Sequence, residues 1–225
     1  MSLLGREPSA WESLDHEDAT ALLRAGTRRA YRPGTVMITE GDIPEFVLLI
    51  RTGRASVSVN TVHGTRLILA LRGPGDIIGE LSAIDGGTRS ATVTALVRTE
   101  AVVIPVGRFT ETLTRRPAAN RVIMRALGGR LRDSDSQRRA LVSATLLQRV
   151  AQVLTELADR AGRVCDDGVR IDLPLPQHEL AALVGATREG TAKALGLLRR
   201  SGVVRTAPRR VIVTDQDLLK AIGTV

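Results

Sequence analysis

Cysteine is nearly absent from this chain. Cys165 is its one cysteine among 225 residues, which excludes a disulfide framework, a cysteine-rich zinc site and an iron–sulfur cluster held by four cysteines of one chain. Long hydrophobic runs are missing as well. Met1–Ser13 lacks the apolar core of a signal peptide, and no run approaches the roughly 18 apolar residues of a membrane helix. We therefore expect a cytoplasmic protein with no membrane segment.

Catalytic signatures are also lacking. The three histidines, His16, His63 and His178, are far apart in the sequence, and no Gly-x-Ser-x-Gly, His-Glu-x-x-His or Walker-type segment occurs. Each histidine is interpreted as an ordinary surface or packing residue. The sequence predicts neither an enzyme nor a metal site.

What the chain has in excess is positive charge. Its formal net charge is +8 and its pI is near 11.1, which favours a polyanionic partner. Nearly all of the 32 basic residues are arginine, a bias that a GC-rich genome also produces, so the average charge carries little weight alone. With 43% hydrophobic residues, the chain can bury two modest cores, and we expect two domains.

The first half changes from helical to strand-like patterning. Residues 9–26 predict short amphipathic helices that end at Gly26. From Arg28 to Pro105, turn signals recur about every ten residues, which is typical of a small antiparallel β-barrel or roll. The expected strands are Thr35–Thr39, Phe46–Arg51, Ala55–Asn60, Leu67–Leu71, Ala91–Ala95 and Glu100–Pro105.

The stretch Gly79–Thr92 combines groups that suit a phosphate joined to a sugar. Its glycines allow close backbone approach, and the Leu81-Ser82-Ala83-Ile84 turn would direct free N–H groups at an anion. Arg89 can bind two phosphate oxygens, Ser90 can donate a hydroxyl, and the Glu80 carboxylate can accept from a ribose hydroxyl. The alternative is a plain hairpin whose glycines serve only as turns.

Gly-Glu-Leu-Ser followed by Arg-Ser-Ala-Thr resembles the phosphate-binding cassette of the CRP/FNR family of bacterial transcription regulators. The resemblance implies that Glu80 binds the ribose 2′-hydroxyl, that Arg89 and Ser90 bind a cyclic phosphate, and that Gly79 and Leu81 give backbone or packing contacts. Ser82 belongs to the same turn, and Thr92 is a candidate near the base. Leu69 could line a base pocket, although a β-roll core needs such residues anyway.

A long helix is predicted from Pro117 to about Ser143. Apolar and polar residues recur at coiled-coil steps of three and four, which favours a homodimer; the alternative is a helix packed only on its own β-roll. The predicted seam comprises Ile123, Leu127, Leu131, Ser134, Arg138 and Leu141.

The seam turns polar at Ser134 and Arg138, where Asp135 could offset the arginine charge. In the family that the chain resembles, this part of the helix reaches the nucleotide base from both subunits. Ser134 and Asp135 stand there by position, and Arg130 lies one turn earlier as a candidate for the base or the pocket wall.

A second motif follows the helix predicted at Leu146–Ala161 and a strand predicted at Gly168–Leu175. Gln177–Val184, a three-residue turn and Arg188–Arg200 have the layout of a helix-turn-helix, with Thr187 as N-cap of the second helix. Arg188, Glu189 and Lys193 fall where a recognition helix meets base edges. The alternative is an ordinary helical hairpin.

Thr187-Arg188-Glu189 with Lys193 also resembles CRP/FNR recognition helices, whereas Gly190-Thr191 departs from the threonine and β-branched residue usual there. The departure puts the docking angle and the DNA sequence in question. The apolar pairs at Val203 and Val211 predict a β-hairpin wing, and a last helix is expected at Thr214–Ile222. The phosphate candidates are Gln177, His178, Thr187, Arg205, Arg209 and Arg210.

These patterns together predict an α+β chain. Residues 1–116 would form an antiparallel β-roll of the cyclic-nucleotide-binding type, 117–144 a long dimerisation helix and hinge, and 145–225 a winged helix-turn-helix. The expected function is that of a homodimeric transcription regulator which binds a palindromic operator under the control of a cyclic nucleotide, cAMP first, with RNA polymerase as a further candidate partner. The rivals are the same DNA-binding role with another effector or none, and a nucleotide-binding regulator that acts on a protein partner.

Overall fold

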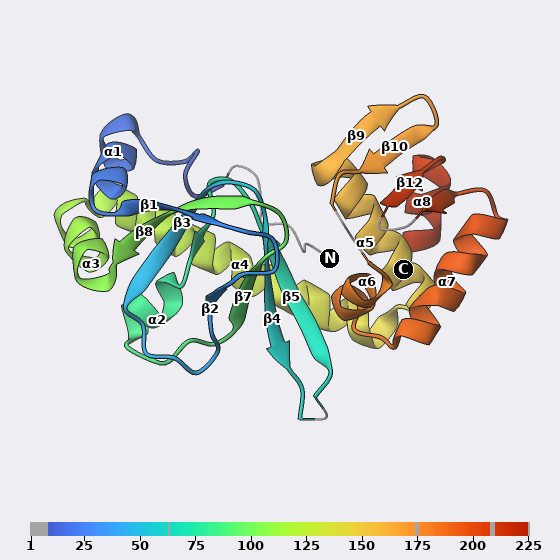
Figure 1. Ribbon diagram of the computed structural model, residues 1–225, viewed down its shortest axis with the longest axis horizontal. Helices are drawn as coiled ribbons and strands as arrows, with labels where there is room; N and C mark the ends of the chain where they lie inside the picture. Colours follow the sequence, from blue (N-terminus) through green and yellow to red (C-terminus); the bar gives the residue numbers. More distant parts are fainter. Residues whose placement is uncertain (1–8, 63, 174–175, 208–209, 225) are drawn as a thin grey trace. The chain divides into compact units, whose positions relative to one another are not determined.

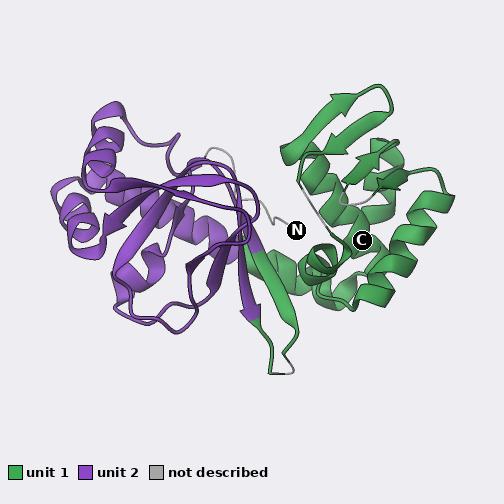
Figure 2. Ribbon diagram, viewed as in Figure 1, with its two compact units in different colours: residues 1–4, 60–69, 133–225 green, residues 5–59, 70–132 purple. Residues whose placement is uncertain are grey.

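The computed structural model describes residues 9–62, 64–173, 176–207 and 210–224, whose path is drawn in Figure 1. They fall into two compact units, coloured separately in Figure 2. One unit holds the residues up to Val59 together with Ala70–Arg132, and the other holds Asn60–Leu69 together with the residues from Asp133 onward. The division falls inside helix α4 (Pro117–Ser143).

Two four-stranded sheets make up the β-roll that follows helix α1 (His16–Arg24). The order in the first is β1 (Thr27–Tyr31), β8 (Thr99–Pro105), β3 (Phe46–Thr52) and β6 (Ile77–Ile78). The order in the second is β2 (Val36–Ile38), β7 (Thr92–Ala95), β4 (Ala55–Asn60) and β5 (Arg66–Arg72). The predicted α+β fold with an N-terminal β-roll is confirmed.

Strand β3 separates two hydrophobic cores. Val47 and Leu49 point into one core, and Leu48 and Ile50 into the other, because successive side chains of a strand face opposite ways. Both faces of β3 are therefore buried, which explains its continuous apolar run.

Helices pack against the core that contains Val47 and Leu49. Helix α3 (Val106–Arg115) contributes Phe109 and Leu113, and α4 contributes Ala119 and Ile123. Ile123 is only 1% exposed. The predicted seam is therefore wrong at its first position, because Ile123 packs into the core of its own chain and is unavailable to a partner. The apolar side chains of α4 that stay exposed are Met124, Leu131, Leu141 and Val142.

The second unit starts a new helix after α4 ends. Helix α5 (Leu146–Ala161) opens with a capping box, in which the Thr145 side chain accepts from the Gln148 N–H and the Gln148 side chain accepts from the Thr145 N–H. Val150, Val153, Leu154 and Leu157 of α5 are fully buried. This helix is the centre of the unit, since it contacts the three helices that follow.

The remaining elements form a small sheet and those three helices. The sheet order is β11 (Val204–Ala207), β12 (Arg210–Val213), β10 (Gly168–Ile171) and β9 (Gly162–Cys165). The helices are α6 (Gln177–Val184), α7 (Arg188–Arg200) and α8 (Gln216–Gly223). Within the described ranges, no helix combines the length and the apolar character needed to span a bilayer.

Candidate functional site

The cassette begins where β6 ends. Gly79 has a φ of +83° and serves as N-cap of helix α2 (Glu80–Asp85). A Cβ at this position would lie 2.5 Å from Nη1 of Arg89 and 3.2 Å from Cδ1 of Ile38. Two features therefore require glycine at position 79: the left-handed backbone conformation, and the Arg89 guanidinium that lies where a Cβ would be.

Arg89 is buried, with 4% of its surface exposed. Its Nη1 donates to Gly79 O and to Ser82 Oγ, at 2.9 Å each, and its Nη2 donates to Phe46 O. Burial lowers the pKa of the Arg89 guanidinium, while the Asp42 and Glu80 carboxylates act in the opposite direction. The fixed charge that the sequence predicts is present, and protein oxygens accept its hydrogen bonds.

Glu80 is also buried, and its partner comes from far along the chain. Nη1 of Arg130 donates to Oε1 of Glu80, while Nη2 of Arg130 donates to Ile77 O at 2.7 Å. The same guanidinium lies 3.6 Å from Oδ1 of Asp76. Helix α4 is thereby tied to the cassette through the carboxylate that was predicted to accept from a ribose hydroxyl.

The other predicted ligand contacts are less closely gathered. Ser90 is exposed, Leu81 is 47% exposed, and Leu69 lies on β5 with 37% exposed. The Thr92 hydroxyl accepts from the Glu40 N–H at 3.1 Å. Ser134, partly buried, and Asp135, exposed, lie on the part of α4 that belongs to the other unit.

The sequence interpretation missed several contributors to this site. Phe46 supplies a carbonyl acceptor, and its ring lies 5.3 Å from the Arg89 guanidinium carbon. Asp76 adds a carboxylate beside Arg130. The Glu40-Gly41-Asp42 segment contributes Asp42, whose carboxylate acts on Arg89. A backbone carbonyl such as that of Phe46 leaves no signal in the sequence. The acidic residue Asp76, which stands three positions before Gly79, could have been recognised from the sequence.

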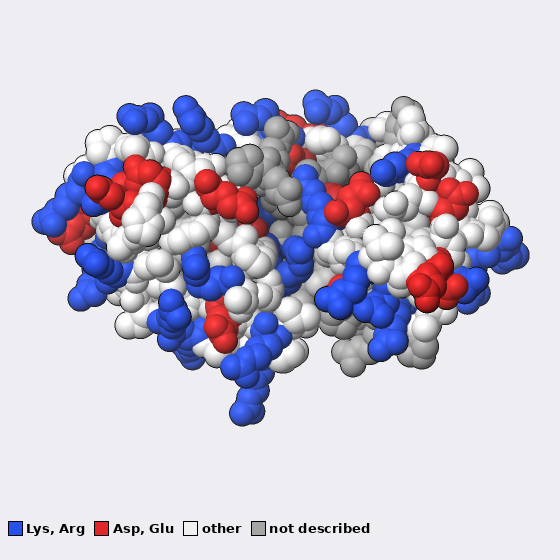
Figure 3. Space-filling model, turned by 90° about the horizontal axis from the view of Figure 1, so that it is seen from above, with Lys and Arg blue, Asp and Glu red and all other residues white. Residues whose placement is uncertain are grey.

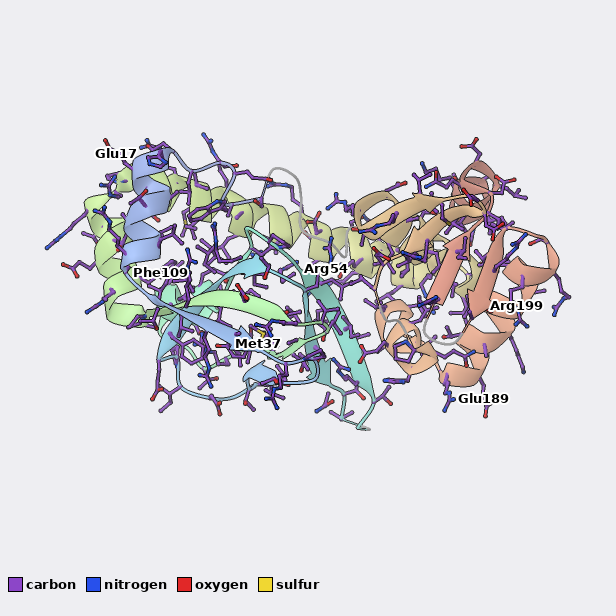
Figure 4. All side chains as sticks on the ribbon, turned by 45° about the horizontal axis from the view of Figure 1, so that its top comes forward. Glu17, Met37, Arg54, Phe109, Glu189 and Arg199 are labelled. Carbon is purple, nitrogen blue, oxygen red and sulfur yellow. The ribbon has the colours of Figure 1, made fainter. Side chains whose placement is uncertain are left out.

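The second site is the start of helix α7. Thr187 caps it as predicted, with its hydroxyl accepting from the Gly190 N–H at 3.1 Å. Arg188, Glu189 and Lys193 are exposed, and Figure 4 shows Glu189 at this end of the helix, pointing outward. The three predicted base-reading side chains therefore lie on one accessible stretch of about one and a half turns.

Gly190 and Thr191 have a packing explanation. A Cβ on Gly190 would lie 3.0 Å from Cδ2 of Leu146, so the glycine lets α5 approach α7 closely. Thr191 is fully buried, and its hydroxyl donates to Thr187 O at 2.9 Å. Glycine at position 190, where the family usually has threonine, thus leaves room for Leu146 at the start of α5.

The candidate phosphate contacts surround this helix. Gln177 and His178 are exposed at the start of α6, and Arg210 is exposed on β12. Arg205 pairs with Asp167, at 3.0 Å between Nη1 and Oδ2, whereas Arg209 lies outside the described residues. Basic and acidic side chains are interspersed in the view of Figure 3, so average charge alone marks no binding face.

Comparisons with known proteins match both domains of the chain. The cyclic nucleotide-binding domain matches residues 28–116, and the Crp-like helix-turn-helix domain matches residues 148–222. The "CRP-like cAMP-activated global transcriptional regulator" of Mycobacterium tuberculosis is 30% identical over 186 residues, 83% of each chain. The "Cyclic AMP receptor protein" of Thermus thermophilus is 30% identical over 213 residues, 95% of each chain.

A solved structure supports the fold. The c-di-GMP responsive global regulator CLP of Xanthomonas campestris superposes with a TM-score of 0.79 at 23% identity, covering 88% of this chain and 99% of that one. Other relatives in sequence are named as regulators, among them the "Transcriptional activator protein FnrL" of Cereibacter sphaeroides at 27% identity over 211 residues, 89% of this chain and 82% of that one. With a cyclic nucleotide-binding domain followed by a Crp-like helix-turn-helix domain, the chain belongs to the CRP/FNR family of transcription regulators.

Proposed function

We propose that this regulator is a cytoplasmic homodimer whose binding to a palindromic operator is controlled by cAMP. The observation that carries the effector assignment is the presence of two buried, oppositely charged groups in the cassette: Glu80 on the first turn of α2, and Arg89 just beyond the end of that helix. A cyclic nucleotide offers one phosphate anion and one ribose 2′-hydroxyl, which are complementary to these two groups. The names of the two 30%-identical relatives support cAMP as the first nucleotide to test.

The cassette residues divide the ligand between them. Arg89 and Ser90 take the cyclic phosphate, and Glu80 takes the ribose hydroxyl. Gly79, Leu81 and Ser82 shape the turn around them. Thr92 and Leu69 lie toward the base, and Arg130, Ser134 and Asp135 approach it from α4.

The hydrogen bonds of Arg89 indicate how the ligand enters. The described contacts use both N–H groups of Nη1 and one of Nη2, so phosphate oxygens can accept from the second Nη2 N–H and from Nε, or replace Ser82 Oγ at Nη1. The same contacts favour a second candidate, in which the cassette is only a structural brace and DNA binding follows another effector or none. A buried arginine whose donors bond backbone carbonyls stabilises a fold without binding any ligand.

The dimer seam that we propose keeps Leu131 and Arg138 from the sequence prediction and shifts its other four positions by one residue. Met124, Leu131 and Val142 are exposed, and they share one face of α4 with Asp135 and Arg138. Successive members of the face are separated by four or three residues, as a coiled-coil seam requires. The full face is Met124, Gly128, Leu131, Asp135, Arg138 and Val142.

In a parallel pair of α4 helices, this face would stack an Asp135 layer on an Arg138 layer. Two carboxylates would then lie beside two guanidiniums, which offsets the like-charge repulsion within each layer. Because Asp135 is also proposed to meet the base, the ligand and the dimer seam would share a residue. Nucleotide binding would tighten the seam and so set the spacing of the two α7 helices.

DNA recognition is assigned to α7 and its surroundings. Arg188, Glu189 and Lys193 read base edges in the major groove. Gln177, His178, Thr187, Arg209 and Arg210 bind phosphates. The proposed domain limits are 1–116 for the nucleotide-binding roll, 117–144 for the dimerisation helix and hinge, and 145–225 for the DNA-binding domain, with RNA polymerase as a further proposed partner.

Two measurements on the full chain test this proposal. Calorimetric titration with cAMP and cGMP should show one nucleotide per chain and tighter binding of cAMP. Operator binding should strengthen with that nucleotide and weaken steeply as salt rises, because phosphate contacts release counterions. Binding of DNA that no nucleotide alters would support the structural-brace candidate, and DNA binding without salt dependence would contradict the assignment of α7.

A further inference from the structure

An acidic loop lies against the cassette. The segment between β2 and β3 carries Glu40, Asp42 and Glu45, all exposed. Two backbone hydrogen bonds fix it to Arg89: the Gly41 N–H donates to Arg89 O at 2.8 Å, and the Arg89 N–H donates to Asp42 O at 2.9 Å. Asp42 is therefore held beside the arginine by reciprocal main-chain contacts.

The charges around the site sum to a negative value. Two guanidiniums, Arg89 and Arg130, stand with three carboxylates: Glu80 hydrogen-bonded to Arg130, Asp76 at 3.6 Å from Arg130, and Asp42 acting electrostatically on Arg89. Phosphate sites ordinarily carry an excess of cations. Here a ligand that brings one negative charge meets the Arg89 cation, and a second negative charge would add repulsion from the Asp42 carboxylate that acts on that arginine.

We propose that Asp42 is a specificity-determining residue that restricts this site to singly charged phosphate diesters and rejects doubly charged phosphate monoesters. The inference rests on the proposed function, since it concerns the same ligand site. A cyclic nucleotide carries one phosphate charge, whereas a nucleoside 5′-monophosphate approaches two at neutral pH because its second pKa is near 6. One additional like-charge interaction at a partly solvated site weakens binding on the order of tenfold.

The selection is useful because the two ligand classes share a base and a ribose. The monophosphate differs from the cyclic nucleotide in its free 3′-hydroxyl, in the open phosphate ring and in the phosphate charge. AMP and its 5′-methyl ester share the base and the whole ribose, so a comparison of these two isolates the charge. The loop acid acts on the charge, and Arg89 acts on both classes alike.

The test separates charge from ring closure with three probes: cAMP, AMP, and the 5′-methyl ester of AMP, which is acyclic but singly charged. Each would displace a fluorescent cAMP analogue from the full-length protein, from Asp42→Asn and from Glu45→Gln. Glu45→Gln is the matched control, because it removes one charge from the same loop at a position with no described effect on Arg89. Thermal unfolding of each variant checks that the exposed substitutions leave the fold intact.

The expected result is that the parent prefers the methyl ester over AMP by about tenfold. Asp42→Asn should reduce that preference to about twofold or less by tightening AMP, while Glu45→Gln keeps it. An unchanged preference in Asp42→Asn, or equal loss in both variants, overturns the inference alone. A parent that does not bind the cAMP analogue overturns the proposed function and this inference with it.

Discussion

The cassette and the recognition helix use similar side chains in opposite ways. Arg89 and Glu80 are buried, and their hydrogen bonds go to other parts of the protein. Arg188 and Glu189 are exposed on the first turn of α7. Both regions contain an arginine and a glutamate, but these side chains are buried in the cassette and exposed on α7.

The difference matches the size of the two expected ligands. A small ligand can be enclosed, so its site gains strong electrostatic interactions from burial, and without the ligand the buried charges need internal partners. A DNA duplex cannot be enclosed. The helix that binds DNA therefore keeps its charged side chains in solvent, where each contact is individually weak and sensitive to salt. Substitutions in the buried site should therefore have larger effects than substitutions on the exposed helix.

The largest effect is expected for Arg89→Leu. Nucleotide affinity should fall by at least about 1,000-fold, since no other described cation faces the same carbonyl-lined position. Stability should also fall, by about 1 to 3 kcal/mol, because the carbonyls of Gly79 and Phe46 lose their donor. Calorimetry and urea denaturation would measure the two effects. Arg98→Leu, at a side chain 77% exposed, is the control, and unchanged cAMP affinity in Arg89→Leu would refute the buried-site assignment.

The next effect tests the polar part of the proposed seam. Arg138→Leu would extend the apolar face of α4, so operator affinity without nucleotide should rise by about 10- to 100-fold, with little further gain on adding cAMP. Arg139→Leu, one position round the helix, should not produce this change. Fluorescence anisotropy of a labelled operator would report it. If Arg138→Leu stays as dependent on nucleotide as the parent, the polar seam is not the switch.

On the exposed side, Glu189→Ala should relax discrimination at one base pair of each half-site by about 1 to 3 kcal/mol. Arg210→Ala should instead weaken all sequences alike and reduce the salt slope by about one. Selection from a random DNA pool separates the two outcomes. A uniform loss for both variants would mean that Glu189 does not meet base edges.

The smallest effect is expected at Gly190. Alanine would gain about 1 kcal/mol of helix propensity, but its Cβ would lie 3.0 Å from Leu146 Cδ2 and 3.1 Å from Thr187 Oγ1. The net change in the free energy of unfolding should stay within about 1 kcal/mol. In a Leu146→Ala background more of the gain should appear, because only the contact with Thr187 Oγ1 remains. Equal changes in both backgrounds would show that α5 does not crowd this glycine.

The helices were predictable because their ends carry local signals. The predicted bounds of α5, α6 and α7 match the structure, with Thr145 and Thr187 as side-chain caps and Gly185 in the left-handed conformation at the end of α6. The strands β1, β6 and β9 were missed. Four of the five residues of β1 are exposed and show no alternation, β6 has only two residues, and β9 has no buried residue.

The candidate site was predictable in its residue types but not in its partners. Glycine, glutamate and arginine at cassette spacing indicated the ligand chemistry. The Glu80–Arg130 contact joins residues 50 positions apart, and the acceptors of Arg89 are mostly backbone carbonyls. The error at Ile123 has a related cause, because heptad spacing cannot distinguish a face that meets a second chain from one that meets its own core.

The capping box at Thr145 and Gln148 has a consequence for modularity. A helix that closes its own first turn needs no contact with the preceding helix to begin, and three hydrogen bonds between Thr145 and Gln148 make this start. A chain cut just before Thr145 would keep them intact. The DNA-binding domain could therefore be fused at that point to a different sensor domain. The fusion would respond to another ligand and would keep the capping box that starts α5.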